Sequence, residues 1–211
     1  MKPYESLKEL ARSKRAEHSV KTAQFGLRKV REIYIAEGIK IDPWDLPKKI
    51  RAIYMCEDGD PSVAISKGLP NEPKLFSMVH ELKHHYVDQQ LMQGGEIRCG
   101  DYNANQVIEI GAEVFAAEFI YPEQEFLDCL DGLEVEPMAC SKEDIVRIKR
   151  ECGAPVSYTF LKKRLVRMGF AAPGAFVGIQ FQKLEETMFG VPIYKQPWFI
   201  QRRARRQRAS I

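Results

Sequence analysis

A stretch near the middle of the chain carries the pattern His-Glu-x-x-His, as His80, Glu81 and His84. Residues i and i+4 of a helix lie one turn apart on the same face, so both imidazoles can point at one metal ion. Glu81 lies about 100° further round the helix, within reach of a metal-bound water without being a ligand. The spacing predicts two metal ligands and a general base on one turn. The alternative is an amphipathic helix whose histidines are ordinary core or surface groups.

The residues around the motif favour a helix. Pro73 suits a first helical position, and Gly94-Gly95 offers a stop. Five apolar residues fall at helical spacing between them, so one side of the segment is expected to be buried. These residues are Leu75, Phe76, Val79, Leu82 and Tyr86.

A metal site needs a third protein ligand, and histidine does not supply it. Only His18 and His85 remain; His18 lies in a charged stretch and His85 points about 100° away from His84. A carboxylate is the usual substitute, as in His₂Glu zinc sites. We therefore expect a Zn²⁺ site completed by a glutamate.

The segment from Val107 to Pro122 provides that glutamate. Glu109 and Glu113 are spaced i, i+4 beside several alanines, on a face suited to pack against another helix. Buried carboxylates need a partner, which a metal and a histidine N–H would supply. We assign Glu109 as the third ligand and Glu113 as the acceptor that orients a ligating histidine. Two alternatives stay open: Glu113 is the ligand, or the helix lies on the surface with scattered glutamates.

This set of residues suits hydrolysis. Zinc lowers the pKa of a bound water to around 7 and polarises a carbonyl, and Glu81 would take the water proton and pass it to the leaving amine. The oxyanion would need a further donor. Tyr86, Tyr121 and His85 are candidates that the sequence does not rank.

The two segments together resemble the ImmA/IrrE metallopeptidases. The resemblance rests on Val-His-Glu-Leu-x-His followed by Glu-x-x-Ala-x-x-Phe-Ala-Ala-x-x-x-x-Pro, and runs over about residues 23–170. It implies a zincin-like fold and a cytosolic zinc peptidase that cleaves transcriptional repressors. By motif position His80, His84 and Glu109 would be ligands and Glu81 the base. Lys83 stands where many members carry Gly, and Gly111 where many carry an acid.

Composition agrees with a cytoplasmic globular protein. The 211 residues are 45% hydrophobic and 29% charged, without an apolar run that could span a membrane or serve as a signal peptide. The five cysteines are odd in number and form no Cys-x-x-Cys pair, so neither a disulfide framework nor a thiolate zinc cluster is indicated. Reduced cysteines are the simplest interpretation.

The chain divides into five expected segments of an α+β fold, mostly helical with a small sheet. Residues 1–19 form a charged helix, 20–139 a zincin-like catalytic domain, 140–170 a closing helical pair, 171–198 an extension of weak pattern, and 199–211 a flexible basic tail. Within the domain we expect a helix over 20–37 and a hairpin with strands over 50–56 and 62–66. Residues 63–66 are a candidate edge strand for pairing with substrate, or part of an ordinary packed hairpin. A strand over 176–181 is a weaker expectation.

Two features leave a nucleic-acid role open. The pair over 140–170 could be a DNA-reading helix-turn-helix with a basic face of Lys162, Lys163, Arg164 and Arg167; we favour a hairpin packed on the core. Five arginines lie within residues 202–208, and without them 27 basic residues face 29 acidic ones. This tail could hold nucleic acid, dock on an acidic protein, or have no defined role.

The sequence thus predicts a zinc endopeptidase that acts on a protein, such as a helix-turn-helix repressor encoded nearby. The alternative is a DNA-associated regulatory protein whose peptidase-like domain binds or senses rather than cleaves.

Overall fold

The structure, a computed structural model, describes residues 4–90, 106–192 and 195–196. Its α-helices are α1 (Glu5–Glu17), α2 (Leu27–Ala36), α3 (Asn71–Lys83), α5 (Gln106–Ile120), α6 (Glu123–Gly132), α7 (Lys142–Glu151), α8 (Tyr158–Arg167) and α9 (Phe181–Phe189). A 3₁₀ turn η1 (Thr22–Gln24) precedes α2, and a π-helical turn η2 (His84–Asp88) extends α3. The strands are β1 (Lys40–Trp44), β2 (Ala52–Glu57) and β3 (Asp60–Ser66).

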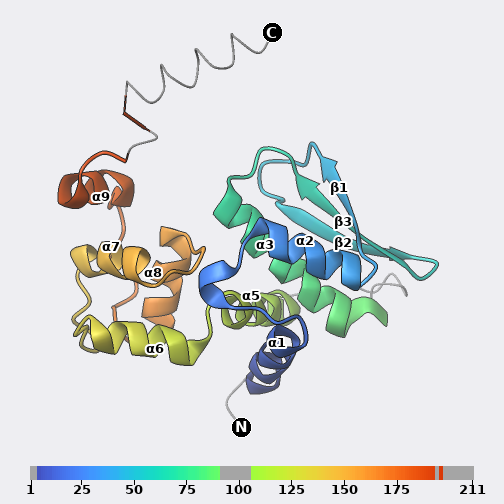
Figure 1. Cartoon of the computed structure of the whole chain (residues 1–211), viewed down its shortest axis with the longest axis horizontal. Helices are drawn as coiled ribbons and strands as arrows, with labels where there is room; N and C mark the ends of the chain where they lie inside the picture. The colour runs from blue at the N-terminus through green and yellow to red at the C-terminus, as the bar shows by residue number, and fades with distance from the viewer. Residues whose placement is uncertain (1–3, 91–105, 193–194, 197–211) are drawn as a thin grey trace.

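The elements form a mixed α+β fold, as predicted. Figure 1 shows the sheet at one end of the molecule and α6 to α9 at the other, with α3 and α5 between them. Helices α3 and α5 pack on each other, and α1 packs across α5. Because Phe115 and Phe119 of α5 and Leu82 of α3 are fully buried, this helix pair forms the centre of the core.

The sheet has the order β1-β3-β2, with β1 parallel and β2 antiparallel to β3. The predicted β2–β3 hairpin is confirmed: Asp58 and Gly59 both have positive φ, as the tight Asp-Gly turn requires. The interpretation of residues 63–66 as a free edge is wrong. Val63 pairs with Ile41 on one side and Tyr54 on the other, so β3 is the central strand.

Two other expected elements differ from the structure. The helix expected over 20–37 begins only at Leu27, because the extended Gly26 separates η1 from α2. The strand expected over 176–181 is wrong: Gly178 turns the chain with φ 77° and α9 begins at Phe181. The aromatic and β-branched residues there are typical of a strand, but Phe176 and Phe181 pack their rings together across the turn instead.

The helical pair α7 and α8 packs on the core rather than presenting a basic face. Ser141 and Ser157 cap the two helices as their sequences predict. Arg164, which the helix-turn-helix alternative placed on the basic face, is only 7% exposed. Lys163 pairs with Glu113 of α5 at 2.7 Å. The arrangement supports the packed hairpin.

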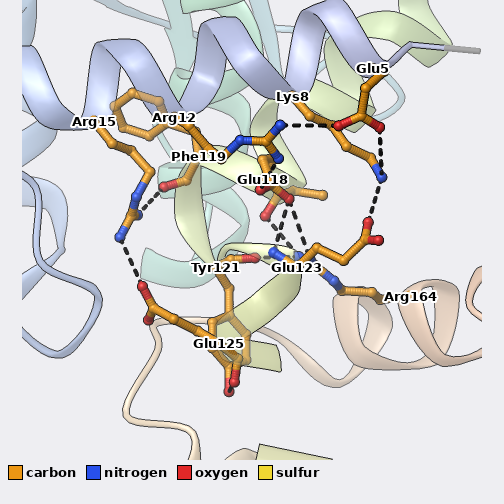
Figure 2. Close-up of polar contacts among 11 residues, drawn as sticks. Glu5, Lys8, Arg12, Arg15, Glu118, Phe119, Tyr121, Glu123, Glu125 and Arg164 are labelled. Atoms are coloured by element: carbon orange, nitrogen blue, oxygen red, sulfur yellow. Dashed lines mark hydrogen bonds and ion pairs between the residues drawn. The ribbon is translucent and has the colours of Figure 1, made fainter. Parts of the chain in front are cut away.

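A cluster of charges joins α1 and α8 to the end of α5 (Figure 2). Buried Glu118 accepts from Arg12 at 3.0 Å and lies 3.6 Å from Arg164. Arg15 donates to the carbonyl of Phe119, and Arg164 to those of Ala117 and Tyr121. The last carbonyls of a helix lack partners within it, so these guanidinium groups complete the C-terminal end of α5.

Removing Arg164 is expected to destabilise the fold. In Arg164→Met the buried Glu118 and the carbonyls of Ala117 and Tyr121 lose a partner, so the free energy of unfolding should fall by about 3–5 kcal/mol. The control Arg167→Met changes an exposed arginine one turn further along α8 and should cost less than about 0.5 kcal/mol. Urea denaturation of both variants measures this, and equal losses would contradict the assigned role.

Among the described residues, no helix is long and apolar enough to serve as a membrane span. The predicted stop at Gly94-Gly95 and the arginine-rich tail lie outside the described residues.

Candidate metal centre

The two motif histidines lie side by side at the end of the core. His80 is on the last turn of α3 and His84 opens η2. Their Nε2 atoms are 3.3 Å apart, and their rings meet edge to face. Regular helix continues from one residue to the other, so the i, i+4 spacing places both nitrogens at one point, as the sequence predicts.

Glu109 of α5 reaches the same point from the opposite helix. Its Oε2 lies 3.1 Å from His80 Nε2 and its Oε1 lies 3.8 Å from His84 Nε2. Glu109 is only 4% exposed. The close packing of α3 on α5 therefore brings a third ligand atom to the pair of histidines.

These three side chains suit a metal ion. Their ligand atoms all lie within 4.8 Å of one another. Tetrahedral zinc with bonds of 2.0–2.1 Å would separate neighbouring ligand atoms by about 3.3 Å, close to the distances between the three groups. Two imidazoles and one carboxylate are also the donors of many catalytic zinc sites. The residues could hold such an ion with small adjustments.

The surroundings of His80 carry an excess of negative charge. Burial lowers the pKa of His80, but the hydrogen bond to Glu109 and the nearby carboxylates of Glu81 and Glu113 outweigh burial, so that the pKa is raised. A buried group of one carboxylate and two imidazoles that attracts a proton in this way offers a place for a metal cation.

Asp88 orients His84 and was missed by the sequence prediction. Its Oδ2 lies 2.7 Å from His84 Nδ1, which leaves the Nε2 lone pair directed at Glu109 and His80. Burial raises the pKa of Asp88, but the hydrogen bonds from His84 and Lys83 lower it further than burial raises it. Asp88 is therefore a charged acceptor, and the signal was present as the i+4 spacing from His84.

Lys83 is buried beside the centre rather than exposed to solvent. Its Nζ donates to the same Asp88 oxygen at 2.6 Å and to the carbonyl of Ile108 at 3.3 Å. A Cβ at Gly111 would lie 3.6 Å from Lys83 Cε and 2.9 Å from Leu7 Cδ1. The two departures from the family pattern are thus linked, because Gly111 leaves the space that Lys83 and α1 fill.

Replacing Asp88 is expected to weaken metal binding without removing a ligand. Asp88→Asn loses the charged acceptor for His84 Nδ1, and such supporting contacts are typically worth roughly 10–100-fold in metal affinity. Competition with a fluorescent zinc chelator would measure the change. The control Asp45→Asn alters an exposed ion pair with Lys67 and should leave the affinity unchanged. Equal affinities of both variants would rule out the orienting role.

Glu113, which was predicted to orient a ligating histidine, lies one turn after Glu109 on α5, and its role stays a prediction. Its Oε1 pairs with Lys163 at 2.7 Å, and Asp88 provides the hydrogen bond to His84. Glu109 and not Glu113 lies in the group of ligand atoms. One turn along α5 separates the two glutamates, so that Glu109 faces the histidines and Glu113 lies nearer α8.

Glu81, the predicted base, is next to the ligands on α3. It is 3% exposed, and its charge contributes to the raised pKa of His80. The geometry is compatible with the predicted role, since the residue follows a ligand directly in the helix.

His85 and the two candidate oxyanion tyrosines are engaged away from the centre. His85 Nδ1 lies 3.1 Å from the Tyr54 hydroxyl, and its Nε2 lies 3.8 Å from Glu37. Tyr86 donates to Glu37 at 2.8 Å, and the Tyr121 hydroxyl lies 3.3 Å from the carbonyl of Glu125. Each of the three residues thus has polar partners outside the group of ligand atoms.

Glu17, His18 and Glu37 form a second group of possible ligands, and Lys14 pairs with both carboxylates of this group. Lys14 Nζ is 2.9 Å from Glu17 and 3.7 Å from Glu37. The lysine already balances these carboxylates, so the first group is the better metal site.

Comparison with known families agrees with this geometry. Residues 37–165 match the IrrE N-terminal-like domain, a match that spans both helices of the centre and most of the described fold. The chain belongs to the ImmA/IrrE metallopeptidase family. The predicted resemblance is thereby confirmed, together with its mostly helical, zincin-like fold.

The ImmA/IrrE fold is also found in a solved structure described as a Mycobacterium tuberculosis transcriptional regulator. The likeness has a TM-score of 0.54 at 18% sequence identity, and covers 77% of this chain and 47% of the regulator. It shows a shared fold, and the chain spans about half the length of that protein. A search of curated protein sequences found no match.

Proposed function

We propose that the chain is a zinc-dependent endopeptidase of the cytoplasm that hydrolyses a peptide bond in a protein substrate. The proposal rests on the convergence of His80, His84 and Glu109, whose ligand atoms all lie within 4.8 Å of one another. Glu81 beside the ligands supports it further, because metal binding alone has no chemical need for that residue. Membership of a metallopeptidase family agrees with this chemistry.

The residues of the metal centre have separate roles in the proposed hydrolysis. A bound zinc ion would act as a Lewis acid on the scissile carbonyl and would lower the pKa of the attacking water. His80, His84 and Glu109 hold their ligand atoms in place, and Asp88 fixes the ring of His84. Glu81 takes the proton from the attacking water and delivers it to the leaving amine.

The substrate that we propose is a transcriptional repressor, of the helix-turn-helix class, encoded near the gene for this chain. The resemblance that led to the family supports it, since members act on repressors. The fold shared with a transcriptional regulator points to the same setting. The alternative is a DNA-associated protein that senses rather than cleaves. Helix α8 does not support it, because Arg164 of the expected basic face is buried in the core.

The direct test incubates the purified chain, loaded with ZnCl₂, with the repressor protein encoded next to it. We expect discrete fragments that disappear when EDTA removes the metal and return when zinc is restored. Cleavage that persists without metal would contradict the proposal. An intact repressor in the presence of fully loaded protein would contradict the assigned substrate.

A further inference from the structure

A cavity of 610 Å³ lies beside the metal centre, between α5 and α8. Phe76 and Glu113 line it: the Phe76 ring is 6.5 Å from the His80 ring, and Glu113 is one turn after the ligand Glu109 on α5. The cavity therefore opens next to the ligands. It is distinct from the centre itself, because none of the three ligand residues lines it.

The cavity follows α8, since residues over the length of this helix line it. Residues of one face of that helix line it at helical spacing, from Thr159 and Phe160 through Lys163 and Arg164 to Arg167 and Met168. Thr159 and Arg167 are eight helical steps apart, which corresponds to about 12 Å along the axis. An extended peptide covers this length with about four residues, at about 3.3 Å each. The space suits a short stretch of extended chain.

The walls combine an apolar surface with an excess of positive charge. Phe76 and Phe160 pack edge to face with ring centres 6.1 Å apart, and Val114 and Ala117 line the α5 side. Five cationic residues line the cavity, against three carboxylates. The cations are Lys8, Arg51, Lys163, Arg164 and Arg167, and the carboxylates are Glu113, Glu118 and Glu123.

Each of the three carboxylates already has a cation. Glu113 pairs with Lys163, and Figure 2 shows Glu118 with Arg164 and Glu123 with Lys8. Arg51 and Arg167 remain: within the described part of the chain, neither lies within 4 Å of a carboxylate. Arg167 has the Tyr4 ring as a neighbour, 6.0 Å away. The cavity thus has two arginines in excess.

We propose that this cavity, the α5–α8 groove, binds an acidic, partly apolar segment of the protein substrate next to the scissile bond. Carboxylates of the segment pair with Arg51 and Arg167, and an apolar side chain between them packs on Phe76 and Phe160. A nucleic-acid strand fits less well, because its evenly charged backbone would face the three glutamates of the walls. The inference deepens the proposed function and rests on it.

The test measures binding rather than cleavage, so that it stays separate from the proposed activity. The protein is the full chain carrying Glu81→Gln, and the probe is a fluorescein-labelled peptide of sequence Ala-Glu-Leu-Ala-Glu-Leu-Ala-Glu, followed by fluorescence anisotropy. A second peptide replaces each Glu of the probe by Gln. We expect the acidic peptide to bind at least ten times more tightly than the neutral one.

Two variants locate the site. Arg51→Gln combined with Arg167→Gln should remove most of the preference for the acidic peptide. Arg31→Gln, which removes an exposed arginine of α2 outside the groove, should keep it. The substituted arginines are all exposed, so none of the changes disturbs the core.

Several outcomes would overturn the inference. It fails if the Glu81→Gln protein binds the two peptides equally tightly or binds neither, or if the double variant keeps the preference. It also fails if a labelled DNA duplex binds more tightly than the acidic peptide and loses binding in the double variant. A preference for acidic peptide in a protein that cleaves nothing would keep the groove as a binding site and reject only the proposed hydrolysis.

Discussion

Replacing Glu81 by Gln is expected to lower the rate of substrate cleavage by roughly 10²–10⁴-fold while zinc remains bound. The amide keeps the size of the carboxylate but cannot accept the proton of the attacking water. Since Glu81 is not among the three ligands, His80, His84 and Glu109 stay in place. Cleavage rates and zinc content of the same preparation measure the two effects together.

The control for this substitution is Glu113→Gln. It removes the same charge from the neighbourhood of His80, but from a residue paired with Lys163 at 2.7 Å. If cleavage depends on the proton acceptor and not on overall charge, Glu113→Gln should retain far more activity. Unchanged proteolysis in Glu81→Gln would reject Glu81 as the base.

Removing Glu109 has the second large effect, on metal binding itself. Glu109→Gln takes away the charged ligand, so zinc affinity should fall by more than the roughly 10–100-fold that a lost supporting contact costs. Glu113→Gln, one turn away on the same helix, should bind zinc nearly as the wild type does. A competition titration with a zinc chelator compares the two variants.

The opposite result would revive the alternative that the sequence left open. If Glu113→Gln loses zinc and Glu109→Gln keeps it, Glu113 is the ligand and α5 must be rotated relative to α3. Circular dichroism of both variants shows whether either change unfolds the chain instead, and the two substitutions are matched in size and charge.

Local pattern predicted the parts of the centre that lie on single helices. The spacing of His80 and His84 and the apolar residues around them define α3, and Glu109 was found because a carboxylate between small residues needs a partner. The contact between Lys83 and Asp88 could not be found in this way. Five residues of regular helix separate two side chains by about 140°, and the π-helical turn η2 brings Lys83 and Asp88 together.

Pairings between distant segments explain the errors in the fold. Strand β1 is short and mostly exposed and contains Pro43, so its composition gave no strand signal, although Pro is tolerated in an edge strand. Its parallel pairing with β3 nevertheless makes β3 central and removes the predicted free edge. The hairpin, by contrast, follows from the adjacent Asp58-Gly59 turn, which the sequence contains directly.

The most direct test of the metal centre is an anomalous difference map at the zinc absorption edge, from crystals of the chain grown with ZnCl₂. The centre described here predicts one strong peak bonded by His80 Nε2, His84 Nε2 and a carboxylate oxygen of Glu109. A peak held by Glu113, a peak only at the Glu17–His18–Glu37 group, or no peak beside His80 would contradict it.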